Sequence, residues 1–110
     1  MHPLISIIVP VYNAAKFIED GIKSIAAQTC DYEAIFIDDG SSDNSGEIIQ
    51  RYVATNSRIY YYRQENQGVV RARANGVAKS KGEWITFLDA DDLLTTELSL
   101  IVNQRIKMGG

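Results

Sequence analysis

The sequence predicts an α/β protein: a Rossmann-like three-layer sandwich in which a mostly parallel sheet carries helices on both faces. Short apolar runs alternate four times with segments whose apolar residues recur at helical spacing, and the connections are short. A length of 110 residues with 45% apolar residues suits a single core, so we expect residues 1–110 to form one domain. We expect right-handed crossovers and the strand order 3-2-1-4 with which a doubly wound sheet of this kind begins.

The predicted strands are four apolar runs. Residues 4–9 are almost continuously apolar and β-branched, which indicates a strand buried on both faces, and Pro10 is expected to end it. Residues 34–37 form the second run. Residues 59–62 are more aromatic and less uniformly apolar, as in an edge strand. Residues 84–88 form the fourth strand, expected to be buried, and lead directly into a cluster of acids.

Helix start signals follow the strands. Asn13 is a plausible N-cap for a helix of about fifteen residues. Asn44 with Glu47 resembles a capping box for the second helix. Residues 66–68 open the third helix, and apolar residues at helical spacing predict a fourth over residues 98–106.

Composition narrows the possible partners. The net charge of −3 argues against a nucleic-acid partner. The single cysteine, Cys30, fits a reducing compartment and is expected to be a packed side chain. The sequence shows no signal peptide and no run near the roughly 20 apolar residues of a membrane span. We therefore expect a cytoplasmic protein, with a membrane-peripheral position of a full-length form left open.

The acids are concentrated at two strand ends. In open α/β sheets, ligands bind beyond the carboxyl ends of the strands, near the point where the strand order reverses. The loops after the first, second and fourth strands should therefore converge on one crevice. Six of the 14 acidic residues fall in two of these segments: Asp38, Asp39, Asp43, Asp89, Asp91 and Asp92.

These residue types suit a nucleotide sugar. Tyr12 offers a ring for base stacking, and a carboxylate after the second strand can accept a base N–H. Asp89 can accept from ribose hydroxyls, while Asp91 can share Mg²⁺ or Mn²⁺ with diphosphate oxygens. Arg71 and Arg73 point in different directions on one helix, and Arg73 is our choice to face the ligand. The ligand role of Pro10 is limited to shaping the base pocket.

Four ordered blocks resemble the family-2 glycosyltransferases of the GT-A fold. The resemblance covers residues 4 to about 100 and is carried by residues 8–13, residues 38–43, Asn66-x-Gly68 through Ala72-Arg73 to Gly76, and residues 82–92. It implies an inverting transferase that uses a nucleotide-diphosphate sugar, commonly a UDP-sugar, and a divalent cation. By this similarity Asp39 contacts the base, with Gly40 beside it in the same block, Asp89 contacts the ribose and Asp91 binds the metal.

Two departures from the family pattern bear on the activity. Ala74 stands where the family often has Asn, and Asn75 follows one position later. Family members also continue for at least another hundred residues, which carry the acceptor site and the general base, so no catalytic residue is assigned in this chain. We expect a donor-binding portion of an enzyme of polysaccharide or glycoconjugate synthesis. Its acceptor, a saccharide or a lipid-linked glycan, would bind the missing half.

Other interpretations stay open beside these. Asp38 is better explained as a local structural carboxylate than as a ligand contact. Asp92 is as consistent with a helix N-cap as with the site. Residues 60–62 are expected to pack against a helix rather than stack on a ligand, and a metal role for His2 is disfavoured.

A Mg²⁺-binding receiver-type signalling domain is the alternative of another class. It would place paired acids after the first strand, whereas here the acids follow the second and fourth. A binding-only domain is a third possibility. The truncation relative to the family also predicts an exposed edge at the fourth strand, through which the chain could form a homo-oligomer.

Overall fold

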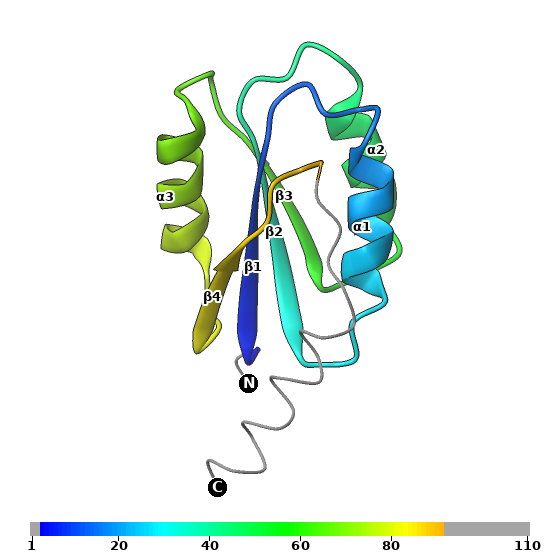
Figure 1. The fold of residues 1–110 in the computed structure, drawn as a ribbon, viewed down its shortest axis with the longest axis vertical. Helices are drawn as coiled ribbons and strands as arrows, with labels where there is room; N and C mark the ends of the chain where they lie inside the picture. Colours follow the sequence, from blue (N-terminus) through cyan, green and yellow to red (C-terminus); the bar gives the residue numbers. More distant parts are fainter. Residues whose placement is uncertain (1–2, 92–110) are drawn as a thin grey trace, which may run out of the picture.

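A computed structural model describes residues 3–91 of the chain. Strands and helices alternate along these residues, as the sequence predicts (Figure 1). The elements are β1 (Ile5–Val11), α1 (Ile18–Ala26), β2 (Tyr32–Asp38), α2 (Ser45–Val53), β3 (Ile59–Arg63), α3 (Val69–Lys79) and β4 (Trp84–Phe87).

The four strands form one parallel sheet in the order β3-β2-β1-β4, which confirms the predicted topology. Figure 1 shows the sheet between two layers, with α1 and α2 on one face and α3 on the other. A receiver-type domain has the order 2-1-3-4-5, so this order argues against that alternative.

Side chains of β1 and β2 alternate between the two helical layers. Ile7, Val9 and Phe36 belong to the main core, which packs against α1 and α2. Their neighbours point to the other face, where α3 approaches the sheet closely enough that a side chain on Gly76 would overlap Ile8. The smaller core on that face consists of Ile8, Ile35, Ile37 and Ala72.

The prediction that Pro10 ends the first strand is wrong, because β1 continues to Val11 and Pro10 pairs with Ile37. Ile8 O accepts from Leu88 N on the β4 side, while Val11 O accepts from Asp39 N on the β2 side. Because hydrogen-bonding direction alternates along a strand, the nitrogen of Pro10 faces the β4 side, beyond the end of β4. The missing donor therefore costs β1 no bond to β2.

The first helix also begins later than predicted. Phe17 occupies its N-cap position, and Asn13 lies four residues earlier in a left-handed conformation with φ 49°. Asn44 does precede α2, but its side chain makes no capping bond; Asp43 Oδ1 accepts from Ser45 N instead. The asparagine and aspartate side chains at these ends therefore organise loops rather than helix termini.

β4 is an exposed edge strand, contrary to the expectation that it is buried. Trp84 is 50% exposed and Phe87 is 49% exposed, and Ile85 is exposed as well. Among residues 3–91 the strand pairs with β1 alone, and α3 packs mainly over β1 and β2. β4 is the edge strand of the sheet in the described part of the chain, and self-association through this edge remains a prediction.

Several expectations fall outside the described residues: the role of Asp92, that of His2, and the helix over residues 98–106. Among residues 3–91, no helix is both long enough and apolar enough to cross a bilayer.

Candidate functional site

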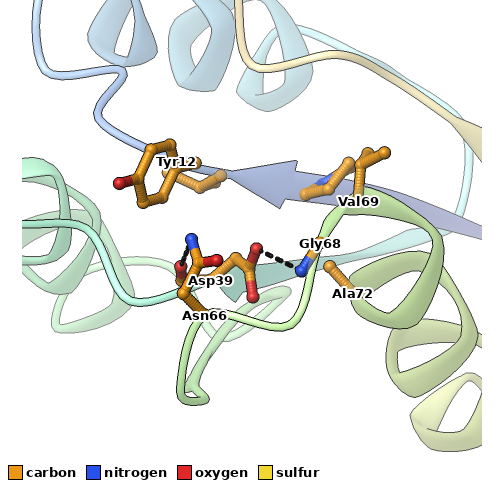
Figure 2. Close-up of a pocket in the computed structure, with 8 residues that line it drawn as sticks. Tyr12, Asp39, Asn66, Gly68, Val69 and Ala72 are labelled. Carbon is orange, nitrogen blue, oxygen red and sulfur yellow. Dashed lines mark hydrogen bonds between the residues drawn. The ribbon is translucent and has the colours of Figure 1, made fainter.

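A pocket of about 280 Å³ opens at the carboxyl ends of β1 and β2, on the sheet face that α3 covers (Figure 2). Open α/β sheets bind ligands at this end of their strands. Three segments form the walls: the end of β1, the residue after β2, and the loop before α3 together with the start of that helix. The lining residues are Pro10, Val11, Tyr12, Asp39, Asn66, Gly68, Val69 and Ala72.

Three of the predicted site residues line this pocket. Pro10 lies on the α3 side of β1, and Tyr12 follows the strand with its side chain exposed. Asp39 comes from the neighbouring strand end and is only 5% exposed. Figure 2 shows Tyr12 across the pocket from Asp39, so an aromatic ring and a carboxylate border the same space.

Asn66, Gly68, Val69 and Ala72 form the third wall and were not predicted as individual binding residues. The sequence did contain signals for this segment, because it is one of the four blocks that resemble the family and has a glycine directly before a helical pattern. Gly68 adopts φ 96°, a conformation that side chains rarely allow, and this turn brings its backbone N–H to Asp39. The backbone rather than a side chain makes this contact.

Asp39 connects the three walls. Its Oδ1 accepts from Gln64 Nε2 at 2.8 Å and from Gln67 N at 2.7 Å, and its Oδ2 accepts from Gly68 N at 2.9 Å. Burial by itself raises the pKa of Asp39, but these three bonds outweigh it and hold the pKa below the ordinary value of 3.8. Asp39 is therefore an ionised, oriented carboxylate.

Gly40 does not line the pocket, although it was predicted as a binding residue. It adopts φ 77°, and a Cβ there would lie 3.0 Å from Asn66 N. Asn66 Nδ2 in turn donates to Asp39 O. The absence of a side chain at Gly40 thus lets the loop before α3 pack against the end of β2.

Asp38 has a structural role, as predicted. Its side chain is fully buried on the α2 face of the sheet, and Oδ1 accepts from Ser41 N at 2.9 Å. Its Oδ2 accepts from Tyr61 Oη at 2.5 Å and from Arg63 Nη1 at 3.1 Å. The carboxylate is therefore turned away from the pocket and joins the ends of β2 and β3.

The loops after β1 and β2 brace one another. Asn13 Oδ1 accepts from Ser42 N at 2.8 Å, and Asn13 N donates to Ser41 Oγ at 2.9 Å. Two further backbone donors of the first loop, on Ala14 and Ala15, bond to Ser45 Oγ and Asp43 Oδ2. These hydrogen bonds between the two loops fix the end of β1, which carries Tyr12, relative to the end of β2, which carries Asp39.

The acids after β4 do not line the pocket. Leu88 N donates to Ile8 O, so Asp89 lies just beyond the part of β1 that pairs with β4. Asp89 Oδ1 lies 3.3 Å from Arg73 Nη2 on α3, which places this pair on the same face of the sheet as the pocket. Asp91 is exposed. Arg73 Nε is buried and has no partner within residues 3–91, so this arginine retains a donor.

A divalent cation is compatible with these acids. No cluster of three or more His, Cys, Asp or Glu residues exists among residues 3–91. Mg²⁺ and similar ions, however, are commonly held by one or two carboxylates together with phosphate oxygens and water. Asp91 and Asp89, both exposed, provide such carboxylates beside the strand end.

Comparison with known proteins assigns the chain to a family. The sequence profile of Glycosyl transferase family 2 matches residues 6–104, most of the chain. The chain belongs to glycosyl transferase family 2.

Two curated relatives of this family-2 chain are about three times its length. It is 37% identical to glycosyltransferase GlyG of Streptococcus pneumoniae over 109 residues, which cover 97% of the chain and 36% of that protein. It is 42% identical to the uncharacterized glycosyltransferase EpsJ of Bacillus subtilis, covering 89% of the chain and 29% of the relative. The chain therefore spans about a third of these relatives.

Solved structures of similar fold include two nucleotide complexes. Residues 1–349 of Staphylococcus aureus TarS, in complex with UDP, match 96% of this family-2 chain and 32% of that protein, with a TM-score of 0.87 and 26% identity. The mannosyltransferase PcManGT of Pyrobaculum calidifontis, in complex with GDP-Man and Mn²⁺, matches 84% and 29% with a TM-score of 0.77 and 26% identity. The GT-A-like fold is thus shared with both.

Proposed function

We propose that this chain is the donor-binding part of an inverting, metal-dependent glycosyltransferase that transfers a sugar from a UDP-sugar during polysaccharide or glycoconjugate synthesis. The observation that carries the proposal is the oriented carboxylate of Asp39 across a pocket from the ring of Tyr12. Family membership and the UDP complex of TarS support it.

The base would enter the pocket between Tyr12 and Asp39. The exposed ring of Tyr12 offers a stacking surface, and the ionised Asp39 accepts an N–H from the base edge. Val69 and Ala72 supply apolar contacts from the start of α3. A flat heterocycle that carries an N–H donor matches these walls.

The ribose and diphosphate would extend toward the end of β4. In this arrangement Asp89 would accept from ribose hydroxyls, and Asp91 would hold a Mn²⁺ or Mg²⁺ ion that balances the charge of the diphosphate. When bound, the cation neutralises the charge that builds up on the leaving diphosphate. Arg73 would donate to the same anionic group through its guanidinium, which lies beside Asp89 at 3.3 Å.

Calorimetric titration of the chain with UDP, in the presence and absence of Mn²⁺, tests the proposal. We expect saturable binding that strengthens with Mn²⁺, and Asp91→Ala should abolish the gain from the metal. Asp20→Ala removes an exposed carboxylate from α1 and serves as a charge-matched control that keeps this gain. Metal-independent binding would eliminate the role of the cation, and absence of UDP binding would refute the donor site.

A further inference from the structure

A chain of side-chain hydrogen bonds leads away from the pocket behind Asp39. Asn75 Nδ2, on α3, donates to Gln64 Oε1 at 2.5 Å, and Gln64 Nε2 donates to Asp39 Oδ1 at 2.8 Å. Gln64 and Asn75 line a separate cavity of about 310 Å³ and do not line the pocket beside Asp39. They can therefore act on a ligand in that pocket only through Asp39.

The chemistry of the groups determines which atom donates in each of these side-chain hydrogen bonds. An ionised carboxylate is an acceptor only, so Gln64 must turn its NH₂ group toward Asp39. Its carbonyl oxygen then faces Asn75, which must present its own NH₂ group. Asn75 thus keeps the Gln64 amide from rotating by half a turn, which would place two oxygens against each other.

The hydrogen bonds already made to Asp39 limit how many more its carboxylate can accept. A carboxylate oxygen offers two acceptor positions. Oδ1 uses both, for Gln64 Nε2 and Gln67 N, whereas Oδ2 uses one, for Gly68 N. A single acceptor position remains, and it lies on Oδ2.

We infer that Gln64, held by Asn75, determines the base selectivity of the pocket by leaving Asp39 one free acceptor that takes the lone N3–H of uracil. This inference rests on the proposed function. Guanine presents two adjacent donors, N1–H and the 2-amino group, which would need both carboxylate oxygens. With Oδ1 occupied, one guanine donor would find no acceptor on Asp39, and the loss of a hydrogen bond to a charged group is costly.

The first measurement is the ratio of UDP to GDP affinity, determined by calorimetry on the full chain. We expect the wild type to favour UDP by roughly tenfold, the effect of one lost hydrogen bond to a charged group. Gln64→Met keeps the side-chain length but frees Oδ1, so this preference should fall to less than about threefold. Asn75→Ala should act in the same direction.

Gln50→Met is the matched control, because it makes the same side-chain change at an exposed position of α2, on the other face of the sheet from the pocket. This variant should keep the wild-type ratio. A residue with a purely structural role would weaken both nucleotides together and leave the ratio unchanged.

The second measurement is the pH below which uridine binding is lost, followed by NMR titration. Uridine carries no phosphate, so acid changes the protein rather than the ligand. Gln64 donates to the ionised form of Asp39 and lowers its pKa, so Gln64→Met should move the loss of binding to higher pH.

The outcomes separate this inference from the proposed function. Failure of the wild type to bind either nucleotide would overturn both. If the wild type binds UDP but shows no preference over GDP, or if Gln64→Met keeps both the ratio and the acid midpoint, the inference alone is overturned.

Discussion

Replacing Tyr61 with phenylalanine removes one donor from the buried carboxylate of Asp38. Tyr61 Oη lies 2.5 Å from Asp38 Oδ2, and the aspartate side chain is fully buried. A hydrogen bond to a charged group contributes about 1.5–3 kcal/mol. Because Arg63 Nη1 and Ser41 N still serve this carboxylate, we expect a loss of about 1.5 kcal/mol in the free energy of unfolding, at the lower end of that range.

Urea and thermal unfolding followed by circular dichroism measure this loss. At about 4–8 °C per kcal/mol for a domain near this size, Tm should fall by about 6–12 °C. Tyr60→Phe is the control, because the exposed Tyr60 points to the opposite face of β3. A change below about 0.5 kcal/mol for Tyr61→Phe, or an equal change in the control, would refute the assigned role of this hydroxyl.

The Tyr61 hydroxyl should also make the unfolding free energy depend on pH. Burial, followed by the hydrogen bond to Asp38, raises the pKa of Tyr61 above its ordinary value of 10.0. A raised folded-state pKa gives stability that is fully present below pH 10 and is lost as the pH rises through the folded value. The difference in unfolding free energy between wild type and Tyr61→Phe should therefore shrink above pH 10.

Three further predictions concern a glycine before β4, an arginine on α3 and an aspartate in the loop after β2. Gly82→Ala should reduce the unfolding free energy by about 1–3 kcal/mol in urea titrations, because a Cβ would lie 2.6 Å from the backbone N of Ser6 in β1. Arg73→Met should weaken UDP binding in the presence of Mn²⁺. It should change the unfolding free energy by less than about 1 kcal/mol, because the ion pair of Arg73 is exposed. Arg71→Met should change neither the UDP affinity nor the unfolding free energy. Burial raises the pKa of Asp43, but its hydrogen bonds outweigh burial and hold the pKa below 3.8. The stability that Asp43 contributes is therefore present above pH 3.8 and is lost in stronger acid. In Asp43→Asn, the unfolding free energy should fall less steeply between pH 4 and pH 2 than in the wild type.

The sheet could be predicted because its signal lies in side chains. Parallel strands buried on both faces read as continuous apolar runs, and β1 and β2 are of this kind. The strand order was expected from the doubly wound class of sheet, and Asp39 was distinguished from the structural Asp38 by the resemblance to the glycosyltransferase family. The exposure of β4 could not be read from its composition, because exposure depends on whether another element covers the strand.

The contacts between the third wall of the pocket and Asp39 escaped prediction because backbone groups make them. Gln67 and Gly68 bind Asp39 through N–H donors that nearly every residue carries. The role of Asn13 was missed for a related reason: an asparagine before a helical pattern predicts an N-cap, and its real partner is a loop 29 residues away. Gln64 and Asn75 are 11 residues apart, and only the folded chain brings them together.

The exposed edge of β4 holds the single tryptophan of the chain, Trp84, half accessible to water. Indole fluorescence shifts to shorter wavelength when the ring loses contact with solvent, so its emission reports directly on the uncovered side of the sheet. A blue shift that grows with protein concentration would reveal pairing between copies. A shift caused by a further polypeptide segment supplied in solution would identify that segment as a cover for β4. Because Trp84 lies at the amino end of β4 and the pocket lies beyond the carboxyl ends of the strands, nucleotide binding should leave this signal unchanged.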